Sequence, residues 1–124
     1  MSDFDNYLKG LLKQILDSYQ ILDDLKDRSG DLEIIKKELS KINGLITVLI
    51  NKLESSKNYS DDFVILISSG KYYLENYYFL DEIETLSKLY SNDSNRLKNL
   101  RFTILKALQE KKLIQKIQTV TEKL

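Results

Sequence analysis

One apolar pattern constrains the fold of this chain more than any other feature of its sequence. Seven apolar residues recur at alternating intervals of three and four, at Leu32, Ile35, Leu39, Ile42, Ile46, Leu49 and Leu53. This spacing keeps one face of an α-helix apolar over three heptads, as in helices that pack lengthwise against a neighbour. Leu45, Val48 and Ile50 widen that face. We therefore expect this helix to lie near the centre of the fold and to contact more than one other helix.

Polar clusters divide the chain into four segments, each with a helical period. The chain has no proline and four glycines, and the clusters occupy residues 27–31, 55–60 and 91–95. The first helix is predicted over residues 3–27, with Ser2 as its cap. The second and third helices are predicted to start at caps on Asp31 and Ser60, because such side chains accept hydrogen bonds from the first free N–H groups of a helix. The fourth is predicted to begin after Asp93 or Ser94.

The third segment contains two features that could disturb a helix. Residues 63–67 form a short apolar run that fits a strand as well as a helix. A strand would need a partner, and no other segment has a strand pattern, so we predict a helix and an all-α fold. Gly70 is expected to bend this helix, because glycine weakens a helix interior by about 1 kcal/mol relative to alanine.

Charge is sorted by segment although the formal net charge is zero. Residues 1–35 carry −4, residues 36–57 carry +3, residues 58–95 carry −5 and residues 96–124 carry +6. In an antiparallel four-helix bundle with up-down-up-down topology, every adjacent pair of segments would then be opposite in sign. The sequence therefore predicts one helical domain over residues 1–124 with that topology. The alternative is an extended helical hairpin that completes its core by oligomerising.

The absence of two residue types excludes several chemistries. The chain has no cysteine and no histidine, which removes disulfides, the usual ligands of transition metals and the Ser-His and Cys-His nucleophile arrangements. The acidic groups at residues 23–27 and 81–84 lack the spacing of a calcium loop or of a di-iron bundle. We expect no metal, no cofactor and no enzymatic activity.

The location of the protein is predicted from two further absences. The acidic start of the chain lacks the basic and apolar regions of a signal peptide. The longest charge-free stretches, residues 42–51 and 63–70, are shorter than the roughly 18 residues of a membrane-spanning helix. We expect a cytoplasmic or otherwise intracellular protein that does not insert into a membrane.

Tyrosines are concentrated in the third segment and supply the first candidate for a partner surface. They are Tyr72, Tyr73, Tyr77, Tyr78 and Tyr90. Tyrosine combines a large apolar ring with a polar hydroxyl, which suits the centre of a protein interface. Most of these rings could instead belong to the core. Tyr77 and Tyr78 point about 100° apart on a helix, so we predict that they are not both buried within one monomer.

The last segment supplies a second candidate through a shift of its apolar stripe. Leu97, Leu100, Ile104 and Leu108 form one stripe, and a second stripe with Leu113 and Ile117 begins in a shifted register after residues 109–112. The end of the chain is therefore expected to face something other than the groove that receives the first stripe. Leu113 and Ile117 are predicted to join the partner surface.

A nucleic-acid surface is the alternative, because the last segment is strongly basic. The candidate residues are Arg96, Lys98, Arg101, Lys111, Lys112 and Lys116. Lysine and arginine bind phosphates and release condensed counterions. These residues do not follow one continuous stripe, so pairing with acidic neighbours is the competing explanation.

Two resemblances bear on that alternative. Asp62-Phe63, Arg96-Leu97, Arg101 and Lys116-Ile117 resemble the helical part of archaeal GINS replication subunits, although the small β domain of that family is missing here. Small helical subunits of CRISPR effector complexes are similar in size and class. Our leading hypothesis is a non-enzymatic helical module that binds a protein partner or a second copy of itself. The alternative is a small subunit of a nucleic-acid-associated complex.

Overall fold

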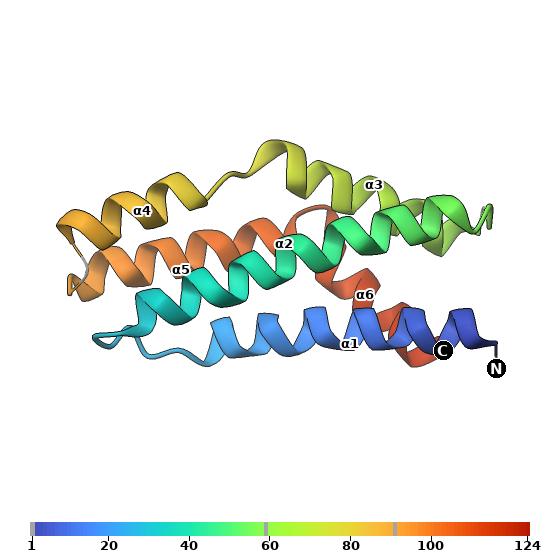
Figure 1. Ribbon diagram of the computed structural model, residues 1–124, viewed down its shortest axis with the longest axis horizontal. Helices are drawn as coiled ribbons and strands as arrows, with labels where there is room; N and C mark the ends of the chain where they lie inside the picture. Colours follow the sequence, from blue (N-terminus) through green and yellow to red (C-terminus); the bar gives the residue numbers. More distant parts are fainter. Residues whose placement is uncertain (1, 59, 91) are drawn as a thin grey trace.

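The computed structural model describes residues 2–58, 60–90 and 92–124, and these residues form an all-helical fold without strands (Figure 1). The elements are α1 (Asp3–Asp24), α2 (Asp31–Ser55), α3 (Asp61–Asn76), α4 (Leu80–Leu89), α5 (Ser94–Gln109), a 3-10 turn η1 (Glu110–Lys112) and α6 (Leu113–Lys123). The apolar run of residues 63–67 lies inside α3, so the prediction of a helix there is confirmed.

Two of the predicted caps are confirmed, and the fourth segment begins after Asp93 as predicted. The Ser2 hydroxyl accepts a hydrogen bond from the Asp5 N–H at 3.1 Å, and the Ser60 hydroxyl accepts one from the Phe63 N–H at 3.4 Å. The Asp93 carboxylate accepts from the first N–H groups of α5. The cap of α2 was predicted wrongly. Gly30, with φ of 94°, takes the cap position, and the Asp31 carboxylate instead accepts from the Arg28 N–H at 2.9 Å.

The third and fourth segments are each split in two, so a bundle of four uninterrupted helices is not confirmed. The third segment does not bend at Gly70, which remains helical and buried beside Ile46 and Ile50 of α2. It breaks at Tyr77, whose backbone is extended between α3 and α4. The fourth segment breaks in η1, where Lys111 and Lys112 adopt left-handed conformations.

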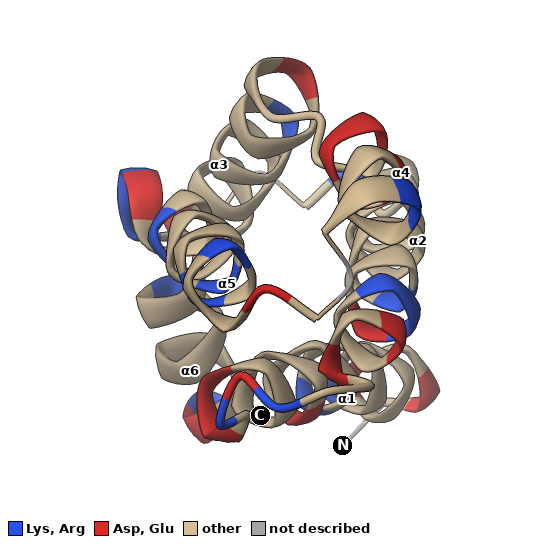
Figure 2. Ribbon diagram, turned by 90° about the vertical axis from the view of Figure 1, so that its left-hand side faces the viewer, with Lys and Arg blue, Asp and Glu red and all other residues tan. Residues whose placement is uncertain are grey.

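The helices enclose a common core, and the four segments α1, α2, α3 with α4, and α5 with α6 run alternately in opposite directions along the long axis (Figure 1). α2 lies between α1 and α3 and packs against both. At the end that holds both termini, α6 contacts α1 and α3; at the opposite end, α4 and α5 contact each other and α2 (Figures 1 and 2). The break in each of the last two segments thus changes which helices are neighbours along the molecule.

The apolar seam of α2 forms the centre of this core, as predicted. All seven seam residues, from Leu32 to Leu53, are at most 3% exposed. Of the residues expected to widen the seam, Ile50 is buried and Leu45 is half-buried, whereas Val48 is exposed. Within the described residues, no helix is long and apolar enough to span a membrane.

Candidate functional site

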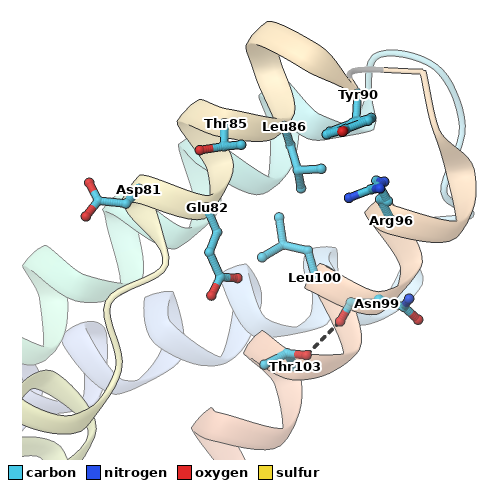
Figure 3. Close-up of a pocket in the computed structure, with 9 residues that line it drawn as sticks. All are labelled: Asp81, Glu82, Thr85, Leu86, Tyr90, Arg96, Asn99, Leu100 and Thr103. Carbon is cyan, nitrogen blue, oxygen red and sulfur yellow. Dashed lines mark hydrogen bonds between the residues drawn. The ribbon is translucent and has the colours of Figure 1, made fainter.

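A groove of about 470 Å³ lies between α4 and α5, and we refer to it as the α4–α5 groove. Its lining comes from the facing sides of the two helices (Figure 3): Asp81, Glu82, Thr85, Leu86, Tyr90, Arg96, Asn99, Leu100 and Thr103. Leu86 and Leu100 point toward each other and are buried, so they form an apolar floor. The groove therefore combines an apolar base with polar walls.

Small polar side chains line both walls of the groove above this floor. Thr85 lines the α4 wall, and Asn99 and Thr103 line the α5 wall. The Thr103 hydroxyl donates a 2.8 Å hydrogen bond to the Asn99 carbonyl of its own helix (Figure 3). Because this hydroxyl is satisfied within α5, it does not bridge to α4. The walls remain open to a side chain from outside.

The two ends of the groove differ in charge. At one end the Arg96 guanidinium lies 3.7 Å from the centroid of the Tyr90 ring and 3.4 Å from the Asp93 carboxylate. At the other end Glu82 points from α4 toward α5, whereas Asp81 points away (Figure 3). Neither Asp81 nor Glu82 has a salt bridge to another described residue. The groove thus has an arginine held by its neighbours and a free carboxylate.

An exposed leucine lies on the same side of α4 as two residues of the groove lining. Leu89 is 69% exposed, which makes it one of the two most exposed large apolar side chains of the described chain. It follows Leu86 by three residues and Thr85 by four, so the three side chains lie along one side of α4. Leu89 is not among the residues predicted from the sequence to contact a partner. Its spacing of three residues from Leu86 was the available signal.

The five tyrosines of the predicted partner surface do not form one surface. Tyr73 is buried, donates a 2.7 Å hydrogen bond to the Asn43 side chain, and has a pKa raised by that burial. Tyr72 and Tyr90 are half-buried. Tyr73 therefore belongs to the core, and Tyr90 alone of the five lines the α4–α5 groove.

The expected contrast between Tyr77 and Tyr78 is confirmed. Tyr77 is half-buried, with its ring stacked on Phe79 at a centroid distance of 5.8 Å, while Tyr78 is 69% exposed. Burial, followed by the negative charge of Glu110, raises the pKa of Tyr77. Tyr78 is thus the one member of the pair that a partner could reach without any change in the core.

Leu113 and Ile117 are not available to a partner, contrary to the prediction. Both are fully buried in the core, as α6 packs against α1 and α3. The physical reason is the break at η1. Two left-handed residues redirect the chain, so the shifted stripe turns back into the core of the same molecule. The shift in the apolar register after residues 109–112 predicted an outward-facing surface. The kink at η1 instead rotates the second stripe toward the core.

Two of the six basic candidates are held in internal ion pairs. Arg101 is buried and donates to the Asp27 carboxylate at 2.8 and 3.1 Å, which raises the pKa of the guanidinium. Lys116 is half-buried and donates to Asp62 at 3.1 Å. These contacts join the fourth segment to the first and third, as the sorted charges predicted. Neither side chain is available to a phosphate without breaking its ion pair.

The other four basic candidates lie in three different places. Arg96 closes one end of the groove. Lys98 lies on α5 with its ammonium 5.5 Å from the centroid of the exposed Phe102 ring. Lys111 and Lys112 form the η1 turn. The six residues of the nucleic-acid hypothesis therefore do not share a surface, because the sequence could not show which of them would be paired internally.

Metal-binding side chains do not gather in the part of the chain that the structure describes. No group of three or more aspartates and glutamates is close enough there to hold an ion. Comparisons with protein-family models, with curated proteins and with solved structures find no match to this chain. The geometry of the groove and of the exposed side chains is therefore what bears on function.

Proposed function

We propose that this protein is a helical interaction module and that the α4–α5 groove receives an amphipathic helix of a protein partner. The apolar ridge of that helix would lie on Leu86, Leu89 and Leu100, and a basic side chain would face Glu82. The observation that carries the proposal is the apolar floor of the groove together with the exposed Leu89, which lies one turn beyond Leu86 on the same side of α4.

The apolar part of the groove explains why binding would be favourable. Fully burying a leucine side chain contributes on the order of 1.5–3 kcal/mol, and Leu89 gains nearly all of this only when a partner covers it. A groove between two helices matches the ridge of a third helix, with anchors spaced by three and four residues. The pocket is also of a size that admits large side chains.

The charges of the groove determine the kind of helix that fits. Arg96 already has Asp93 and the Tyr90 ring as partners, so it offers little to an acidic ligand. Glu82 has no such partner among the described residues and points into the groove (Figure 3). Opposite charges across an interface increase the association rate and select the partner. A basic amphipathic helix is therefore the favoured occupant.

A binding role is favoured over catalysis by the side chains present. The groove contains carboxylates, threonine hydroxyls and an arginine, and the hydrogen bond within it joins Thr103 to the backbone of Asn99. Nucleophilic catalysis needs a nucleophile within hydrogen-bond reach of a base. The described residues of the groove show no such pair.

Site-specific photocrosslinking tests this proposal. A photoreactive residue at position 89 should form an adduct in the source cell, whereas one at position 64 should not. Val64 is a matched control, because it is a 49% exposed aliphatic residue on α3, outside the groove lining. Mass spectrometry of the adduct should identify a basic amphipathic helix. An acidic or extended segment in the adduct, or equal labelling at both positions, would refute the proposal.

The affinity of the identified segment provides a quantitative second step. As a synthetic peptide, it should bind Leu89→Ala about 5–30-fold more weakly than the wild type, whereas Val64→Ala should leave binding unchanged. Glu82→Gln should reduce the association rate, with Glu84→Gln as its control because Glu84 already pairs with Lys88 at 3.3 Å. Equal effects of Leu89→Ala and Val64→Ala would exclude the groove as the binding surface.

A second candidate function rests on the outer face of α5. This helix contains no acidic residue, and its exposed Phe102, at 50%, lies four residues from both Lys98 and Lys106. An aromatic ring between cations is a common arrangement for stacking a base of a single-stranded nucleic acid between phosphate contacts. Two free lysines supply few phosphate contacts, so this candidate ranks below the groove.

A gel shift with single-stranded RNA or DNA at low salt tests the second candidate. Phe102→Ala should weaken binding by about 1–3 kcal/mol, the usual loss for one stacked base. Lys98→Glu with Lys106→Glu should abolish binding, while Lys36→Glu with Lys37→Glu on α2 should reduce it far less. No shift at low salt, or equal losses in the two charge variants, would exclude nucleic acid as a ligand of this face.

A further inference from the structure

A second hollow lies beside the η1 turn and shares no residue with the α4–α5 groove. It has a volume of about 480 Å³ and is lined by Ser68, Ser69 and Tyr72 of α3 and by Lys111 and Lys112 of η1. We refer to it as the kink pocket. The break between α5 and α6 thus places two adjacent lysines in the same pocket as two adjacent serines of α3.

The conformation of the turn is fixed from α3. The Ser69 hydroxyl, on a buried residue, donates a 3.1 Å hydrogen bond to the Lys111 carbonyl. Lys111 and Lys112 have φ angles of 53° and 59°, so the chain is kinked there, and both side chains are exposed. The backbone that carries the two lysines is therefore fixed by a hydrogen bond to the core. A ligand that binds there would lose less free energy to the ordering of this backbone.

The two ammonium groups give the kink pocket a positive balance. Neither Lys111 nor Lys112 has a salt bridge to another described residue. The Lys111 ammonium lies 5.0 Å from the centroid of the Tyr72 ring. Glu110 of the same turn adds one negative charge, which, after burial, contributes to raising the pKa of Tyr77. The η1 turn therefore carries two positive charges and one negative charge.

We propose that the kink pocket binds the phosphoryl group of a small organic phosphate. Lys111 and Lys112 would donate charge-assisted hydrogen bonds to the phosphoryl oxygens. The Ser68 hydroxyl is exposed and now donates to the Ile65 carbonyl of its own helix at 3.1 Å, so it can rotate toward the ligand. The volume exceeds what a phosphate ion fills, and the Tyr72 ring offers an apolar wall for an organic part.

Adenosine monophosphate, inorganic phosphate and adenosine are suitable probes, because together they separate the phosphoryl group from the organic part. In an NMR titration, adenosine monophosphate should cause saturable shifts at the backbone amides of Ser68, Ser69 and Tyr72. Inorganic phosphate should shift the same amides, with equal or weaker affinity. Adenosine should bind far more weakly than either.

The double variant Lys111→Gly with Lys112→Gly removes both ammonium groups while glycine retains the left-handed backbone. Affinity for adenosine monophosphate should fall at least about tenfold, as expected when charged hydrogen bonds are lost. Lys57→Gly is the matched control, because Lys57 also has a positive φ, of 56°, and lies outside the kink pocket. Its affinity should equal that of the wild type.

Three results would overturn this proposal. The first is the absence of saturable shifts with adenosine monophosphate and with phosphate. The second is unchanged affinity in a folded double variant, which a retained amide spectrum would establish. The third is binding of adenosine as tight as that of its monophosphate, because the Tyr72 ring rather than the lysines would then be the determinant.

Discussion

Ser18 interrupts the apolar stripe of α1, and its hydroxyl donates a 3.0 Å hydrogen bond to the buried Glu38 carboxylate of α2. Arg101 plays a similar part between α5 and the end of α1. Besides Asp27, it binds the Leu22 and Asp23 carbonyls, which belong to the last turn of α1. These carbonyls lack partners within the helix, so Arg101 helps to end α1 at Asp24 rather than at the predicted residue 27. Single polar residues thus decide details that the apolar pattern leaves open.

The close approach of α3 to α2 at Gly70 leads to a prediction about packing. A Cβ at Gly70 would lie 3.1 Å from Ile50 Cδ1 and 3.3 Å from Ile46 Cγ2. Gly70→Val should therefore destabilise the protein by about 1–3 kcal/mol, the usual cost of overpacking. Gly44→Val is the control, since nothing lies within 4 Å of its Cβ, and it should change stability by less than about 0.5 kcal/mol. Urea unfolding measures both, and similar losses would contradict the packing role.

The ion pairs of Asp62 lead to a prediction about pH. Hydrogen bonds from Lys123 and from Lys116 lower the pKa of this carboxyl below its ordinary 3.8. A carboxyl with a lowered folded pKa stabilises the fold above the unfolded value, and the contribution is lost as the pH falls through the folded pKa. Asp62→Asn should therefore lower the Tm at pH 7, and the two curves should converge as the pH falls through the lowered pKa of Asp62, below 3.8.

Asp61→Asn is the control for the pH experiment. Asp61 shares the first turn of α3 with Asp62 and therefore interacts with the same helix dipole, but it has no salt bridge to a described residue. Thermal unfolding followed by circular dichroism between pH 2 and pH 7 measures both variants. If the two substitutions lowered the Tm equally, the helix dipole rather than the lysines would explain the effect.

At the scale of the elements, the breaks rather than the helices distinguish this fold. The prediction located a disturbance of the third segment at Gly70, where a glycine weakens a helix, but the break occurs at Tyr77. The Tyr77 ring packs between Tyr73 and Phe79, with centroid distances of 6.1 and 5.8 Å. The backbone of Tyr77 is extended where its ring makes these contacts. Gly70, in contrast, is helical and packs closely against α2. Helix propensity alone therefore pointed to the wrong position.

The break at η1 gives a prediction about backbone strain. A left-handed conformation costs a residue with a Cβ roughly 1–2 kcal/mol, and glycine avoids most of this cost. Lys111→Gly and Lys112→Gly should each stabilise the fold by about 0.5–1 kcal/mol, because the greater freedom of unfolded glycine offsets part of the gain. Lys106→Gly, within α5, should instead destabilise it by about 1 kcal/mol. Chemical denaturation distinguishes these signs, and destabilisation by all three would argue against the left-handed turn.

At the scale of the whole molecule, α6 closes the core at the end that holds both termini. Its contacts with α1 and α3 bury Leu113, Ile114, Ile117 and Val120. The ion pairs of Asp62 with Lys116 and Lys123 lie along the same junction. The other end is formed by α4 and α5, where the groove remains open. The molecule thus has one closed end and one end with an unfilled groove.

The role of α6 in closing the core can be tested at Ile117. Ile117→Ala should destabilise the fold by about 2–5 kcal/mol, since it removes a fully buried side chain and leaves a cavity. Gln118→Ala, on the exposed side of α6, should change stability by less than about 0.5 kcal/mol. The midpoint of denaturant unfolding measures both variants. A small loss at Ile117 would mean that this residue is free for the partner surface that its register had suggested.

The sequence by itself determined the helical class, the central position of α2, two of the three predicted caps and the exclusion of histidine and cysteine chemistry. These properties depend on residue types and on contacts within a turn or two of a helix. Only the tertiary structure decided where the third and fourth segments break, that Leu113 and Ile117 are buried, and that a groove lies beside Leu89. Such outcomes depend on residues far apart in the chain, such as Arg101 and Asp27, 74 positions apart. A periodic pattern contains no information about which of those residues will meet.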